Sequence, residues 1–85
     1  MANAVEARVR TIVADVLRAL PGNVRPETKL LAGVVDWGQI RSIAHKIEKT
    51  FGIHFGAYEP ELWVDVADIV VATERAIAAA DREAA

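Results

Sequence analysis

Hydrophobic residues recur at helical spacing in three stretches of the chain. In the first stretch they are separated by steps of one, three or four positions, which places them on one helical face. These residues are Val5, Val9, Ile12, Val13, Val16, Leu17 and Leu20. Asn3 is a suitable N-cap, and Pro21-Gly22 is expected to end the helix because proline cannot continue its hydrogen-bond ladder. The pattern therefore predicts a first helix between Asn3 and Pro21.

A second helix is predicted from Trp37 to Phe51. Its apolar face consists of Ile40, Ile43, Ala44, Ile47 and Phe51, and its polar face of Arg41, Ser42, His45, Lys46, Lys49 and Thr50. Asp36 can cap its first turn with a carboxylate, and Gly52 supplies the left-handed residue that commonly ends a helix. Gly38 costs roughly 0.5–1 kcal/mol relative to alanine in a helix, so it is expected either to remove an apolar contact or to make room for the neighbouring indole.

The last helix is predicted to begin after Asp65, its N-cap. Its buried side is expected to contain Val66, Ile69, Val70, Thr73 and Ile77. Pro60 favours the first position of a helical turn, so Pro60–Trp63 is predicted as a short helix, with Ile53 and Phe55 pointing inward before it. Residues 21–35 form a long connection that Leu30 and Leu31 are expected to anchor. Residues 1–85 are thus predicted to form a single all-α domain, a small four-helix bundle with three long helices and one short one.

Composition and charge narrow the possible functions. The 85 residues include no cysteine, which excludes disulfides and thiolate zinc sites and is consistent with a cytoplasmic protein. The start of the chain does not resemble a signal peptide, and no apolar run reaches membrane-spanning length. Residues 1–50 hold eight Lys or Arg and five Asp or Glu, a net +3, while residues 51–85 hold two and seven, a net −5. This balance argues against a nucleic-acid-binding domain.

Catalytic and metal-binding patterns are not evident. Neither His45 nor His54 has a second histidine or a cysteine three or four positions away, and His45 is expected to be a solvated surface residue. No Ser-His-Asp order, glycine-rich phosphate loop or paired carboxylates stand out. We therefore do not expect an enzyme or a metal site.

The stretch around the second helix resembles acyl carrier proteins and the related aminoacyl and peptidyl carriers. The matching residues are Gly33, Asp36, Ile40, Ile43, Ile47, Glu48, Phe51, Gly52 and Ile53, preceded by Leu30 and Leu31 in the loop. The family pattern is Gly-x-x-Asp-Ser, then a helix with this apolar spacing and a Phe-Gly-Ile-like end. The resemblance covers essentially the whole chain. It implies a carrier of fatty-acid, polyketide or aminoacyl groups, held as thioesters on 4′-phosphopantetheine.

One residue departs from that pattern at the position that matters most. Asp36 is followed by Trp37, where the family has the serine that carries phosphopantetheine. Tryptophan has no hydroxyl, so the chain as written cannot be charged there, through natural loss or through engineering. Ser42 is the only serine in the sequence, but it lies a turn and a half into the helix.

Three roles for Trp37 remain open. The indole could pack against the short helix near Leu62 or Trp63, adding on the order of 2–3 kcal/mol of burial. It could occupy the groove where a carried acyl chain would lie, or it could be an exposed anchor for a partner. The residues predicted to bind partners are Gly38, Ile40, Arg41, His45, Lys46, Lys49, Leu62 and Trp63.

The exposed side of the second helix departs from fatty-acid-type carriers, which present acidic residues there. This chain presents Arg41, Lys46 and Lys49 against Glu48. Poor recognition by enzymes that read an acidic helix is therefore expected. The resemblance lies closer to the small aminoacyl carriers.

The expected function is an acyl or aminoacyl carrier protein in a form that cannot be charged. For a parent with serine at position 37, the implied partners are an acyl or aminoacyl ligase, synthase enzymes and a phosphopantetheinyl transferase. The first alternative is a natural non-charging module that docks on a synthase or ligase. The second is an unrelated helical regulator that binds nucleic acid through its basic residues. A monomer without membrane or nucleic-acid partners is expected.

Overall fold

The computed structural model describes residues 4–30 and 36–84, apart from the side chains of residues 21 and 84. The elements are α1 (Ala4–Leu17), the 3₁₀ turn η1 (Pro21–Asn23), α2 (Trp37–Phe51), the 3₁₀ turn η2 (Glu59–Leu62) and α3 (Val66–Ala84). Within these residues there is no strand, only an isolated antiparallel bridge between Lys29 and Asp65. The all-helical prediction is therefore confirmed. The predicted short helix is a single 3₁₀ turn, so the α-helices of the described residues number three.

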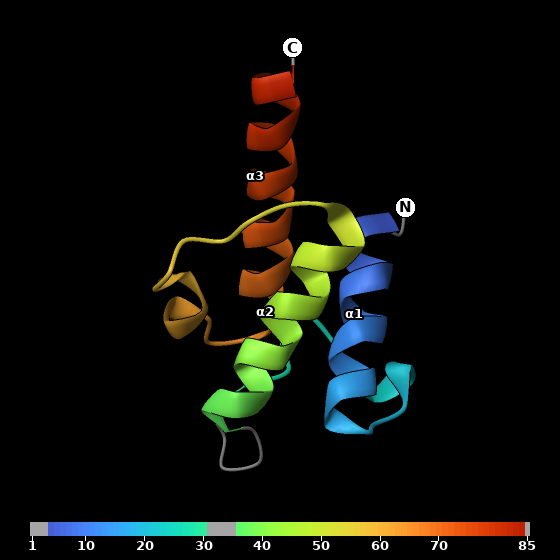
Figure 1. Ribbon diagram of the computed structural model, residues 1–85. Helices are drawn as coiled ribbons and strands as arrows, with labels where there is room; N and C mark the ends of the chain where they lie inside the picture. Colours follow the sequence, from blue (N-terminus) through green and yellow to red (C-terminus); the bar gives the residue numbers. More distant parts are fainter. Residues whose placement is uncertain (1–3, 31–35, 85) are drawn as a thin grey trace.

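The three helices form a small bundle in which α1 contacts both α2 and α3 (Figure 1). α1 runs opposite to α2 and α3, and η2 lies on the side of α2 that faces away from α1 (Figure 1). The C-terminal half of α3 projects beyond the other helices. Within the described residues, no helix combines the length and apolar character needed to cross a membrane.

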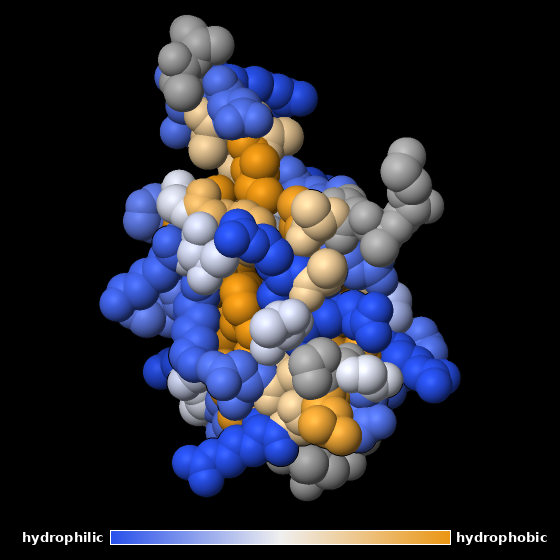
Figure 2. Space-filling model, turned by 90° about the vertical axis from the view of Figure 1, so that its right-hand side faces the viewer, coloured by the Kyte–Doolittle hydropathy of each residue, from blue (hydrophilic) through white to orange (hydrophobic). Residues whose placement is uncertain are grey.

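The core is built from the apolar stripes that the sequence predicts. The largest fully buried side chains are those of Val9, Val13, Val24, Leu30, Ile40, Ile43, Ile47, Val66, Ile69 and Thr73. Burying one such aliphatic side chain contributes about 1.5–3 kcal/mol. The Thr73 hydroxyl, buried in the core, donates a hydrogen bond to the Ile69 carbonyl oxygen at 2.8 Å, which satisfies its polar atom. On the side of the molecule where α1 lies, hydrophobic residues form an interrupted strip between hydrophilic ones (Figure 2).

α1 ends earlier than predicted. Its last helical residue is Leu17, and Arg18 adopts a left-handed conformation with φ 55°. The Ala19 N–H then donates to the Ala14 carbonyl oxygen at 2.8 Å, which closes the end of the helix. Leu20 consequently lies outside the helix and is 72% exposed, so its predicted place on the buried stripe is wrong. The proposed cap Asn3 lies outside the described residues.

The connection between α1 and α2 is tied to the start of α3. The Leu30 N–H donates to the Val64 carbonyl oxygen at 2.9 Å, and the Val66 N–H donates to the Thr28 carbonyl oxygen at 3.1 Å. Arg10 of α1 adds a bond from Nε to the Val24 carbonyl oxygen at 2.6 Å. The predicted anchoring by Leu30 is confirmed by its burial. Leu31 and Gly33 lie outside the described residues.

α3 begins where the sequence predicts. The Asp65 carboxylate accepts a hydrogen bond from the Asp68 N–H at 3.0 Å, as an N-cap does. The predicted buried side is also confirmed, with Ile77 partly buried and the other four residues buried. The segment before η2 points inward as expected, since Ile53 is buried and Phe55 packs on the core.

Candidate functional site

The N-terminus of α2 is held by a complete capping box. Asp36 has an extended backbone, and its Oδ1 accepts a hydrogen bond from the Gln39 N–H at 2.8 Å. The Gln39 side-chain oxygen accepts one from the Asp36 N–H at 3.0 Å. Both groups satisfy donors that a helix start leaves free. The predicted cap is confirmed, and Trp37 is fixed as the first residue of the helix.

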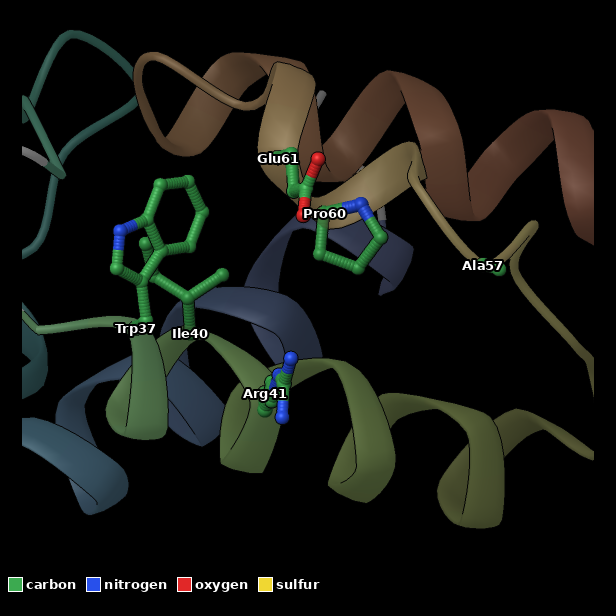
Figure 3. A pocket seen from close by; sticks show the side chains of 6 residues that line it. All are labelled: Trp37, Ile40, Arg41, Ala57, Pro60 and Glu61. Atoms are coloured by element: carbon green, nitrogen blue, oxygen red, sulfur yellow. The ribbon is translucent and has the colours of Figure 1, made fainter.

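Trp37 stands at the mouth of a pocket between α2 and η2. The pocket has a volume of about 390 Å³ and is lined by Trp37, Ile40, Arg41, Ala57, Pro60 and Glu61. Figure 3 shows the indole rising from the start of α2 toward η2, which carries Pro60 and Glu61. The indole remains 49% exposed. It therefore faces the short turn, as one interpretation predicts, but it is only half removed from solvent.

The pocket differs from the predicted surroundings of Trp37. One of the three interpretations places the indole near Leu62 or Trp63, whereas the η2 residues that share the pocket are Pro60 and Glu61. Leu62 and Trp63 line a separate hollow against α3. Sequence reasoning missed Ala57, Pro60 and Glu61, because a hydrophobic period encodes neither the orientation of a single 3₁₀ turn nor the path of the segment before it.

Two of the residues predicted to bind partners belong to the core. Ile40 is 1% exposed and Trp63 is 3% exposed, so a partner reaches either residue only within the hollow that it lines. Ile40 is buried because it begins the apolar stripe of α2, and Trp63 because its ring packs edge-on against Phe55, with centroids 5.1 Å apart. The other predicted partner-binding residues are exposed: Gly38, Arg41, His45, Lys46, Lys49 and Leu62.

Gly38 leaves room for the cap. A Cβ atom added at this position would lie 3.2 Å from the Asp36 Oδ1. That spacing is tighter than ordinary van der Waals contact, so a larger residue would press on the carboxylate that holds the helix start. The absence of a side chain at position 38 thus supports the capping box next to Trp37.

Part of the basic charge on α2 is offset by neighbouring elements. Lys46 Nζ lies 2.6 Å from Asp15 Oδ2, which joins α2 to α1. The hydrogen bond and charge of Lys46 lower the pKa of the Asp15 carboxyl. Because this pair offsets the charge of Lys46, the α2 face is less basic than its sequence indicates. The sequence gives no signal for such a pair, since its members are 31 positions apart.

Glu48 holds the segment that follows α2. Its Oε2 accepts a hydrogen bond from the Phe55 N–H at 2.9 Å and lies 3.8 Å from His54 Nδ1. The carboxylate is therefore engaged within the chain rather than presented as an isolated surface charge. His45 is exposed, as predicted, and the His54 side chain is almost fully exposed. In the part of the chain that the structure describes, no three His, Cys, Asp or Glu side chains gather as a metal site would require.

Fold and site together define a small helical protein with a capped helix start, where a half-exposed tryptophan borders a pocket. No model of a known protein family matches the sequence, and a search of curated proteins finds no significant relative. The assignment of a function consequently depends on this site and on the carrier-like sequence pattern.

Proposed function

We propose that this protein is a carrier-like module of the acyl or aminoacyl carrier class that cannot be charged, because Trp37 stands at the attachment position. The observation that carries the proposal is the placement of Trp37 as the first residue of α2, directly after the Asp36 cap and half-exposed. An attachment residue must be accessible to a modifying enzyme and close to groups that tolerate a phosphate. A helix N-terminus satisfies the second condition through its free N–H groups and its dipole.

Phosphopantetheine does not fit the residue that is present. The arm requires a hydroxyl oxygen at position 37, and the indole offers only a ring N–H. Ser42 does not replace it, because this residue lies in the body of α2 rather than at its capped start. No carrier chemistry therefore proceeds through Trp37, and ligases, synthases and a phosphopantetheinyl transferase are partners only of a Trp37→Ser form.

The arrangement of the elements supports the proposal. A carrier-type bundle has three long helices with a short one before the last, and η2 lies at that point of the chain. Leu30 anchors the first loop, and Gly52 ends α2 in a left-handed conformation with φ 65°, as the carrier pattern expects. These features agree with the resemblance at positions independent of Trp37.

The experiment is to restore the missing oxygen and offer the arm. Trp37→Ser and, as a matched control, Trp37→Ala are incubated with coenzyme A and a broad-specificity phosphopantetheinyl transferase. Intact-mass spectrometry should show the gain of one arm on Trp37→Ser and none on Trp37→Ala or the unaltered chain. Adding Ser42→Ala to Trp37→Ser should leave the gain unchanged. A folded Trp37→Ser protein that gains no mass contradicts the proposal.

A second candidate function is a docking module for a synthase or ligase, which the exposure of Trp37 favours. Tryptophan is enriched at binding hot spots, and Arg41 lies one helical turn away on the same side of the pocket. If this function is correct, Trp37→Ala should weaken binding to a purified ligase or synthase encoded beside this protein by about tenfold or more. Equal binding by Trp37→Ala and the unaltered chain contradicts it.

A further inference from the structure

η2 separates two hollows on the surface. A 3₁₀ turn has three residues per turn, so Glu59 and Leu62 lie on the same edge. Both line a second hollow against α3, whereas Pro60 and Glu61 face the Trp37 pocket. We name this hollow the η2–α3 groove. It has a volume of about 260 Å³ and is lined by Glu59, Leu62, Trp63, Asp68, Val71, Ala72 and Arg75.

The groove has a packed floor and an apolar rim. Trp63 and Ala72 are buried in the floor, while Leu62 is 74% exposed and Val71 is 46% exposed. Exposed aliphatic side chains that line one hollow over a buried floor are typical of a protein contact surface. Their exposure contributes nothing to the stability of the bundle as it stands.

Charge along the groove favours a cationic partner. Glu59 and Asp68 contribute two carboxylates against the guanidinium of Arg75. Asp68 is held in place, because its Oδ2 accepts hydrogen bonds from the Val64 N–H at 2.8 Å and the Asp65 N–H at 3.4 Å. A negative charge held beside apolar side chains in the groove complements a partner in which lysine or arginine flanks an apolar side chain.

We propose that the η2–α3 groove docks a basic amphipathic helix of a partner protein. The apolar face of that helix would contact Leu62 and Val71, and its Lys or Arg residues would meet Glu59 and Asp68. This is the helix-in-groove mode of recognition, in which a few apolar anchors give affinity and flanking charges select the partner. The groove involves neither Trp37 nor Arg41, so it goes beyond the proposed carrier-like function and does not depend on it.

The test uses Trp63 as a reporter. The chain has two tryptophans, so Trp37→Phe leaves Trp63, in the floor of the groove, as the only one. The probe is a synthetic amphipathic helix of leucine and lysine without aromatic residues. Its controls are a scrambled peptide and an analogue in which glutamate replaces lysine. The basic helix should change the Trp63 emission saturably and bind at least about tenfold more tightly than either control.

Variants of the groove decide whether binding occurs there. In the same background, Leu62→Ser should weaken binding by about tenfold or more, and Val71→Ser offers a second test on α3. Leu20→Ser is the matched control, because Leu20 is similarly exposed but lies outside the groove, and it should bind like the parent. Glu59→Gln should reduce the salt dependence of binding while leaving the apolar contacts intact.

Several results would overturn the proposal. Undiminished binding by folded Leu62→Ser and Val71→Ser variants would show that the peptide contacts another surface. Equal affinity for the glutamate analogue would remove the electrostatic argument. Concentration-dependent self-association in sedimentation that Leu62→Ser abolishes would assign the groove to a second copy of this chain instead.

Discussion

Removing the Asp36 carboxylate should destabilise the start of α2. Asp36→Ala removes the carboxylate that accepts the hydrogen bond from the Gln39 N–H at 2.8 Å. The second bond of the capping box, from the Asp36 N–H to the Gln39 side chain, then stands alone. Loss of an N-cap costs about 1 kcal/mol, with a range of roughly 0.5–2 kcal/mol. Loss of a negative charge near the helix N-terminus adds roughly 0.3–1 kcal/mol at low salt. The expected decrease in the free energy of unfolding is therefore about 1–2 kcal/mol.

Urea denaturation followed by far-ultraviolet circular dichroism measures this difference. For a domain of this size, 1 kcal/mol corresponds to a shift of about 4–8 °C in Tm, so thermal melts give an independent value. Asp36→Asn is the control, because it keeps an acceptor oxygen and loses only the charge. It should lose less than half of the stability that Asp36→Ala loses.

A double-mutant cycle tests whether the two capping bonds act together. Gln39→Ala in the Asp36→Ala background should cost less than it does in the parent chain, because the reciprocal bonds form one unit. If Asp36→Ala leaves the free energy of unfolding within about 0.3 kcal/mol of the parent, well below the range expected for a lost cap, the cap does not hold Trp37 at the start of α2.

Three further predictions concern the same bundle. Gly38→Ala should gain less than the roughly 0.5–1 kcal/mol expected from helix propensity, because its Cβ meets the Asp36 carboxylate, and denaturation should show the full gain when Asp36→Ala is also present. Lys46→Met should return the lowered pKa of Asp15 to its ordinary value, which an NMR titration measures. Because folding lowers this pKa, the pair stabilises the folded protein at pH values above the ordinary pKa of an aspartate. This stabilisation is lost as the pH falls through the pKa of Asp15 in the folded protein. The Tm of Arg18→Gly should be higher than that of Arg18→Ala. The left-handed conformation at φ 55° costs glycine about 1 kcal/mol less than it costs alanine. Equal Tm values for the two variants would contradict this prediction.

Local patterns explain why much of the fold could be predicted from the sequence. Asp36, Gly52 and Asp65 lie at the helix boundaries that the sequence predicts, because each acts on backbone groups within a few residues. The apolar stripes of α2 and α3 were predictable for the same reason, since helical periodicity determines which residues share a face. The end of α1 was not, because the left-handed Arg18 stops the helix before the stronger proline signal is reached.

The candidate site was predictable only in part. Trp37 and Asp36 follow from the helix start. The residues across the pocket from Trp37 come from η2 and from the segment before it, where the apolar spacing is irregular. The burial of Trp63 depends on its edge-on contact with Phe55, which is a property of the packed structure. Helix caps leave a local signal in the sequence, and apolar stripes leave a periodic one. Ion pairs and pockets that form between distant segments leave neither.

Because Trp37 is only partly buried, the fold depends on its side chain less than it would on a core residue. Full burial of a large aromatic side chain contributes about 2–3 kcal/mol, so an indole that is 49% exposed gains roughly half of that amount. The capping box beside it does not involve the indole, since its bonds join Asp36 and Gln39. A serine at position 37 would therefore cost the bundle on the order of 1 kcal/mol and leave the capped helix start in place. It follows that exchanging the residue at this position tests the proposed function without first dismantling the fold.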